Sequence, residues 1–191
     1  MSSNQHLNPN NSRNFTLFGH NSILIGTYLL LFVYALKSML DGFLLETSML
    51  GMMSIEIIEL TGLSLTILFA ILSGTAVFFS CRRNCRKNHI KVWNTPTKRQ
   101  VLLYLICTMI FIVAMLLSSS LGLSHFLSPI FLSAIGIILL VLNKNRTQAP
   151  WLMTVLALAL AMLTIFIPMY WYSALLILGI AFVVYGMTVK K

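Results

Sequence analysis

Six long apolar runs, separated by shorter polar segments, take up most of this chain. They cover residues 23–43, 57–80, 101–120, 125–142, 151–167 and 173–189. A helix needs about 20 predominantly apolar residues to cross the hydrocarbon core of a bilayer. Because each run approaches or reaches that length, the pattern predicts an all-α membrane protein built as a six-transmembrane-helix bundle.

The segments between the runs indicate how the helices follow one another. Residues 121–124 and 168–172 leave room only for tight turns, so the helices on either side of each turn are expected to be antiparallel neighbours. Extending this pairing to the first two runs gives three helical hairpins. Residues 1–21 are rich in Asn and Ser and are predicted to form a polar cytoplasmic tail, whereas residues 22–191 form a single polytopic membrane domain.

Charged residues are segregated along the chain. All four acidic residues lie between positions 41 and 59. The 13 Lys and Arg residues, apart from Lys37, lie in the N-terminal tail, the 82–99 segment, the 144–146 turn and the C-terminus. Cytoplasmic loops of membrane proteins accumulate Lys and Arg. Six crossings with both termini inside place all these basic segments on one side, so the predicted orientation is N-in and C-in.

The composition excludes other classes of protein. With 58% hydrophobic and 9% charged residues, the chain departs from soluble domains, which carry about 25% charged residues. A net charge of +9 would suggest a nucleic-acid partner for a soluble protein. Here the cations adjoin apolar runs, where topology and attraction to anionic lipid headgroups explain them. Short loops and the absence of eukaryotic targeting features favour a bacterial cytoplasmic (inner) membrane. No nucleic-acid partner and no cofactor is predicted.

Two charges at the end of the first run are candidates for chemistry. Lys37 and Asp41 lie one helical turn apart near its predicted outer end. Charges inside a bilayer usually pair or face the bundle interior, so these residues are candidates for an ion or proton relay together with Glu56 and Glu59. The alternative is that the first span ends near Lys37 and that Asp41 is interfacial. Glu56 and Glu59 are also explained by the favourable interaction of carboxylates with a helix N-terminus.

Small residues recur every four positions in the second run, at Gly62, Thr66, Ala70 and Gly74. Such a stripe lets two helices approach closely, and packing rather than the hydrophobic effect drives helix association within lipid. We expect the stripe to be a helix-packing surface inside the bundle rather than a dimer interface, because five other helices need packing surfaces.

Met49, Met52 and Met53 cluster between the first two runs, among the acidic residues. Thioethers suit Cu(I), so the cluster is a candidate for a copper entry site. The chain has 11 Met residues, however, and Met is a common flexible filler of apolar regions. The sequence therefore predicts no metal site.

No catalytic signature stands out in the sequence. The leading hypothesis is a small integral membrane protein with a non-enzymatic accessory, regulatory or protective role. It would act through helix packing with membrane lipids, with a membrane protein partner or with a second copy in a homo-oligomer. The alternative is a small-solute or ion transporter or channel that uses the region of Lys37 and Asp41. A membrane-embedded enzyme is the third hypothesis.

The charge distribution yields a prediction about topology. In Asn94→Cys and Asn145→Cys variants, the new thiol should react with a membrane-impermeant reagent from the cytoplasmic side only. In a Thr47→Cys variant it should react from the outside only, because the basic segments stay inside. Labelling of all three positions from the same side would contradict the six-span prediction.

Overall fold

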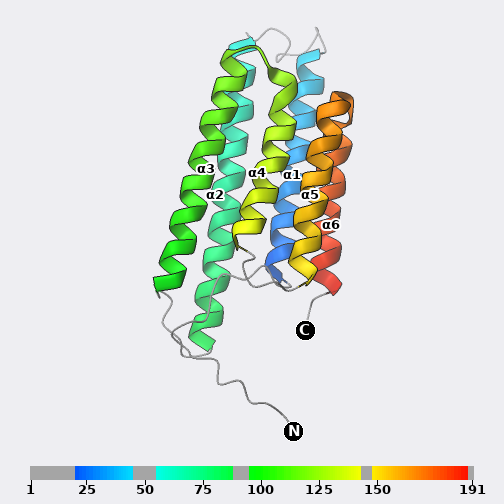
Figure 1. The fold of residues 1–191 in the computed structure, drawn as a ribbon. Coiled ribbons are helices and arrows are strands. Elements are labelled where there is room, and N and C mark those ends of the chain that lie inside the picture. The colour runs from blue at the N-terminus through cyan, green and yellow to red at the C-terminus, as the bar shows by residue number, and fades with distance from the viewer. Residues whose placement is uncertain (1–19, 45–54, 88–94, 143–147, 189–191) are drawn as a thin grey trace.

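Helices make up almost all of the described part of this protein (Figure 1). The computed structural model describes residues 20–44, 55–87, 95–142 and 148–188. These ranges hold six α-helices, two short 3₁₀-helices and no strand, which confirms the predicted all-α class and the number of main helices. In chain order the elements are α1 (His20–Leu44), α2 (Ile55–Lys87), α3 (Thr95–Ser120), η2 (Ser124–Phe126), α4 (Leu127–Leu142), α5 (Gln148–Phe166), η3 (Pro168–Tyr170) and α6 (Trp171–Thr188).

The apolar segments of the described helices fall into two length classes. Four apolar segments are long enough to cross a membrane: Asn21–Leu44, Ile57–Phe79, Thr97–Ser120 and Pro168–Thr188. The apolar segments of α4 and α5 are shorter, at Leu127–Val141 and Trp151–Phe166. At about 1.5 Å per residue, the 16 residues of α4 extend over about 24 Å, against about 30 Å for a typical hydrocarbon core.

Two helices extend well beyond the predicted runs. The second run was expected to end at Ser80, but α2 continues without a break to Lys87. The third run was expected to begin at Val101, but α3 begins at Thr95. Charged residues end an apolar run without ending a helix, because Arg and Lys have high helix propensity. The run boundaries therefore mark changes in polarity, and the helices continue past them.

The turn after α3 is closed by a glycine. Gly122 has a φ of 69°, in the left-handed region that glycine adopts without strain. Its N–H donates to the carbonyl of Ser119 at 3.0 Å, and the N–H of Leu123 donates to the carbonyl of Ser118 at 2.9 Å. This pair of bonds is the Schellman motif that commonly ends helices. It reverses the chain in a few residues, so α3 and α4 are antiparallel neighbours as predicted.

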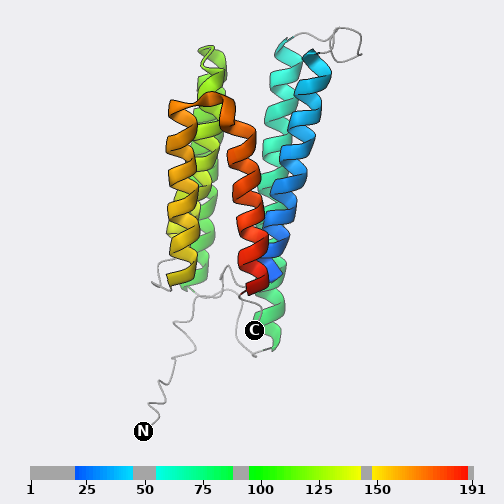
Figure 2. The same ribbon diagram turned by 90° about the vertical axis from the view of Figure 1, so that its right-hand side faces the viewer.

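The helices form a ring in the order α2, α1, α6, α5, α4, α3. Figure 2 shows α6 between α5 and α1, and Figure 1 shows α2 and α3 at the opposite side of the bundle. The members of each predicted hairpin are neighbours, but the most extensive packing joins different hairpins, α1 to α6 and α4 to α5. The ring is weakest between α2 and α3, which touch at few positions.

Glycines explain why α1 packs so closely against α6. A Cβ added to Gly26 would lie 2.9 Å from the backbone oxygen of Gly179, and one added to Gly179 would lie 2.7 Å from Leu30 Cδ2. The α4–α5 pair has a similar approach, because a Cβ on Gly136 would lie 2.9 Å from Leu158 Cδ2. At Gly26 the obstacle to a side chain includes backbone, whereas at Gly179 and Gly136 a neighbouring Leu side chain would have to shift. The absence of a side chain at these positions lets the helices approach closely.

The core lies mainly on the side of the ring formed by α1, α4, α5 and α6. Its fully buried apolar side chains include Leu29, Val33, Leu132, Leu178 and Phe182. Helix α3 contributes little to it, because Thr97 and Gln100 are the only buried residues among its described side chains. The pair α2 and α3 therefore rests against one side of a well-packed group of four helices.

The two ends of the bundle carry opposite charge. Figure 1 shows that α1, α3 and α5 begin, and α2, α4 and α6 end, at the same end. We call it the basic end, because Arg82, Arg83, Arg86, Lys98 and Arg99 lie there, all exposed. The opposite end is called the acidic end, because it carries Asp41 and Glu59.

The close approach at Gly26 predicts a specific loss of stability. Gly26→Ala should destabilise the protein by about 1–3 kcal/mol, because the new methyl group overlaps backbone that cannot move aside. Gly62→Ala is the matched control, since its Cβ would meet no heavy atom closer than 3.8 Å. Thermal denaturation in detergent measures both, and equal stability of the two variants would contradict this explanation of the α1–α6 contact.

Candidate functional site

A cavity of about 430 Å³ lies between α2 and α3 and reaches inward to α1, α4 and α6. We call it the α2–α3 cleft. Ile71 and Leu105 line it and are themselves more than half exposed, so they form its rim between the two helices. Phe182 and Leu139 lie at its back, in the core. The weak contact between α2 and α3 is what leaves this space open.

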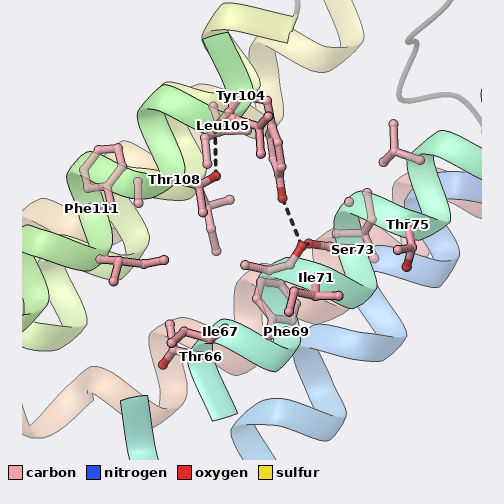
Figure 3. A pocket seen from close by; sticks show the side chains of 18 of the residues that line it. Thr66, Ile67, Phe69, Ile71, Ser73, Thr75, Tyr104, Leu105, Thr108 and Phe111 are labelled. Atoms are coloured by element: carbon pink, nitrogen blue, oxygen red, sulfur yellow. Dashed lines mark hydrogen bonds between the residues drawn. The ribbon is translucent and has the colours of Figure 1, made fainter. Parts of the chain in front are cut away.

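The hydroxyl groups along the cleft are already hydrogen-bonded within the protein. Thr66, Ser73, Thr75 and Thr108 donate to backbone carbonyls three or four residues earlier in their own helices, at 2.8–3.1 Å. Tyr104 reaches across from α3, and its hydroxyl donates to the carbonyl of Ala70 at 3.1 Å (Figure 3). The walls therefore offer an apolar surface to any molecule that enters.

Gln100 is the exception among the polar residues that line the cleft. Its side chain is 6% exposed, and neither its amide nitrogen nor its amide oxygen has a hydrogen-bond partner among the residues that the structure describes. Gln100 lies in the second turn of α3, at the basic end of the cleft. Leaving a buried amide unpaired costs about 1–3 kcal/mol. A bound molecule that supplied a hydrogen bond to this side chain would therefore be stabilised.

A second cavity, of about 560 Å³, lies toward the acidic end, and we call it the acidic-end cavity. It is lined by side chains from α1, α2, α3, α4 and α6. The hydroxyl of Ser119 donates to Glu59 Oε2 at 2.6 Å in its wall. His125 also lines it, as does Ser128, whose buried hydroxyl has no hydrogen-bond partner within the described ranges. This cavity is the more polar of the two.

Three phenylalanines lie between the two cavities. Phe32 of α1, Phe69 of α2 and Phe131 of α4 are buried, and their ring centroids are 5.2–5.7 Å apart in all three pairs. Phe69 and Phe131 line the cleft, and Phe32 and Phe131 line the acidic-end cavity. The mutual contact of the rings joins α1, α2 and α4 at the place where the two cavities adjoin, since Phe131 lines both.

The charged residues that the sequence singled out contact different groups and, where their side chains are described, not one another. The Lys37 ammonium lies 4.4 Å from the ring centroid of Tyr172, in a cation–π contact, and not in an ion pair with Asp41. Asp41 is exposed. Glu59 is bound to Ser119, and the side chain of Glu56 lies outside the described part of the structure. These positions do not test a relay, which stays a prediction.

The predicted packing stripe faces the interior and the cleft. A Cβ on Gly62 would meet α1 at 3.8 Å, from Leu36 Cδ1, and one on Gly74 would meet the Tyr104 hydroxyl oxygen at 3.4 Å. Thr66 lines both cavities, and Ala70 accepts the hydrogen bond from α3. These spacings are ordinary contact distances, larger than those at Gly26 and Gly179.

The methionine cluster of Met49, Met52 and Met53 lies outside the described residues. Within the described ranges, no group of three or more His, Cys, Asp or Glu side chains is placed to hold a metal ion. The copper interpretation therefore remains a hypothesis about a segment whose arrangement the structure does not describe.

Comparison of the chain with protein-family models, with curated proteins and with solved structures found no match.

The contact between Lys37 and Tyr172 predicts the outcome of a double-mutant cycle. Lys37→Met and Tyr172→Leu should show a coupling free energy of about 0.5–1 kcal/mol, because each substitution alone removes the cation–π contact. Lys37→Met and Asp41→Asn should be additive within about 0.5 kcal/mol, as expected of independent sites. Unfolding in detergent measures both cycles. A larger coupling to Asp41 than to Tyr172 would indicate a buried ion pair instead.

Proposed function

We propose that this protein is a small integral membrane protein with a non-enzymatic accessory or regulatory role, which it performs by holding an apolar lipid chain in the α2–α3 cleft. The observation that carries this proposal is the cleft itself. Its walls are apolar, its hydroxyls are internally bonded, and its rim lies between the two helices of the ring that touch least. A lipid chain that moves sideways within a bilayer would meet such an opening directly.

The proposal includes insertion of the bundle in a membrane. The outward face of α3 supports this, because Leu102, Met109, Ile110 and Leu117 are each more than half exposed. Soluble proteins rarely expose apolar surface so continuously. We propose six crossings with both termini on the cytoplasmic side of a bacterial inner membrane, since that places the basic end inside. The short helices α4 and α5 are compatible with this, because a bilayer thins locally around short spans.

The chemistry of the cleft favours binding over catalysis. Its volume of about 430 Å³ falls within the range of about 300–1,000 Å³ that is typical of ligand pockets. Among the described residues that line it, none is a His, Lys, Arg, Asp, Glu or Cys. General acid–base catalysis needs a titratable group within hydrogen-bond reach of the reacting atom, and the one tyrosine in the lining, Tyr104, already donates its proton to the carbonyl of Ala70. An apolar chain needs only apolar walls, which these residues supply.

One observation favours a transporter as a second candidate function. The cleft and the acidic-end cavity lie on either side of the ring contact of Phe32, Phe69 and Phe131, and Glu59 lines the second cavity. Movement of these rings would connect the two spaces. Under this hypothesis an ion-flux signal in liposomes should require Glu59, and it should be lost in Glu59→Gln while the protein stays folded.

The lipid-binding proposal predicts where a photoactivatable phospholipid will label the protein. In proteoliposomes that contain a phospholipid with a diazirine on its acyl chain, the label should concentrate on α2 and α3 residues that line the cleft. Thr108→Phe should reduce this labelling at least fivefold, equivalent to about 1 kcal/mol, because the added ring occupies the cleft. Mass spectrometry of the digested protein locates and quantifies the label.

Met109→Phe is the matched control, since Met109 is 63% exposed on the outward face of the same helix. Labelling of the cleft should persist in that variant. Uniform labelling around the whole bundle, or equal labelling in the two variants, would refute lipid binding in the cleft.

A further inference from the structure

The unpaired amide of Gln100 indicates that the molecule in the cleft has a polar part at the basic end. Every other polar side chain that lines the cleft has a hydrogen-bond partner within the described protein, whereas the amide of Gln100 has none. A carboxamide has two N–H donors and a carbonyl acceptor, and burial without partners is unfavourable. A chain with no polar group would leave this amide unpaired. An amphipathic lipid, with ester and phosphate oxygens above its chains, would satisfy it.

Two arginines of α2, Arg82 and Arg86, lie on the same helix face as the residues that form the α2 rim of the cleft. Ile71 and Thr75 line the cleft and are exposed, and they mark the side of α2 that borders the opening. Arg82 lies seven residues after Thr75 and Arg86 lies four further on, which is the spacing of residues on one helix face. Both arginines are exposed. They therefore lie beyond the basic end of the cleft, in line with its α2 rim.

On α3 as well, a basic residue lies beyond the basic end of the cleft, in line with the residues that form its rim. Leu105 and Val101 line the cleft, and Lys98 precedes them by seven and three residues, on the same face of α3. Lys98 is exposed. Arg82, Arg86 and Lys98 thus extend both rims at the end of the cleft where Gln100 is buried. The tendency of basic residues to lie on the cytoplasmic side explains why cations lie at this end. It does not explain why these three lie on the helix faces that form the rims.

We propose that the α2–α3 cleft selects an anionic phospholipid from the leaflet at the basic end. This inference rests on the proposed function, that is, on the binding of a lipid chain in the cleft. One acyl chain occupies the apolar space, and the Gln100 amide, once its side chain turns toward the cleft, donates to an ester or phosphate oxygen at the top of that chain. Arg82, Arg86 and Lys98 attract the negative headgroup, as basic side chains near a membrane surface do.

Charge complementarity favours a lipid over a second copy of the chain. All four acidic residues lie between positions 41 and 59, so the basic end carries no carboxylate of its own sequence to offer a partner copy. Two copies in one membrane have the same orientation and would bring their basic ends together. An anionic headgroup, in contrast, supplies the missing negative charge.

The test compares two phospholipids with identical acyl chains, a phosphatidylglycerol and a phosphatidylcholine, as competitors of the photoactivatable phospholipid in vesicles that contain the full-length protein. The wild-type protein should prefer phosphatidylglycerol by at least about tenfold. A rim variant that combines Arg82→Gln, Arg86→Gln and Lys98→Gln should lose this preference and keep its affinity for phosphatidylcholine. The control combines Arg83→Gln and Arg99→Gln, which lie at the same end but are rotated by about 100° from Arg82 and Lys98, and it should keep the preference.

Gln100→Met separates a binding role from a structural one. It should weaken the competition by both phospholipids about equally, because both carry ester and phosphate oxygens. It should also raise the melting temperature of the delipidated protein, since the substitution removes an unpaired buried amide. A lowered melting temperature, or unchanged competition, would refute the role assigned to Gln100.

The outcomes distinguish this inference from the proposed function. If neither phospholipid competes for the cleft, lipid binding itself is refuted. If both compete equally well against the wild-type protein, chain binding stands and headgroup selection is refuted. If the label on the cleft is displaced by another polypeptide or a second copy and not by either phospholipid, the cleft is a protein interface and the lipid proposal is wrong.

Discussion

The close approach of α1 and α6 at Gly26 and Gly179 determines how the rest of the bundle packs. At these positions a methyl group would overlap backbone or neighbouring side-chain atoms, so the two helices lie as near to each other as their backbones allow. Gly136 supports a similar approach of α4 to α5. These two contacts form the pairs α1–α6 and α4–α5, and the packing of α5 against α6 joins them into one group, in which most of the large buried side chains lie. The described parts of α2 and α3 have no such close contact with each other, and the space left between them is the cleft.

The polar groups along the cleft explain why the space fits an amphipathic molecule. Hydroxyls that are bonded to the carbonyls of their own helices present carbon and hydrogen to the cavity, and the Tyr104 bond to Ala70 joins α3 to α2 while leaving the space beside it open. The rings of Phe32, Phe69 and Phe131 contact one another where the cleft adjoins the acidic-end cavity. At the basic end Gln100 remains unpaired, and the proposed lipid satisfies it there. The cleft is therefore apolar along its length and polar at one end, as a phospholipid is.

The sequence predicted the class and the six helices because long apolar runs are a local property of the chain. It did not predict the cleft, which depends on which helices become neighbours. Gly26 is one of ten glycines, and nothing near it in the sequence identifies Gly179, on the last helix, as its partner. Gln100 precedes the third apolar run, which begins at Val101, so the pattern did not show that it lies inside α3, which begins at Thr95. The stripe from Gly62 to Gly74 was recognisable, but whether it faces a tight contact or a cavity depends on the packing of distant helices.

The most direct test of this account is an experimental density map of the full-length protein in nanodiscs that contain phosphatidylglycerol. The account predicts an elongated non-protein density between α2 and α3, with its narrow part beside Phe69 and Thr108 and its wide part beside Gln100. It also predicts that Gly26 and Gly179 remain in contact. A map in which α2 and α3 close against each other, with the cleft filled by their own side chains and with no density beside Gln100, would contradict the account.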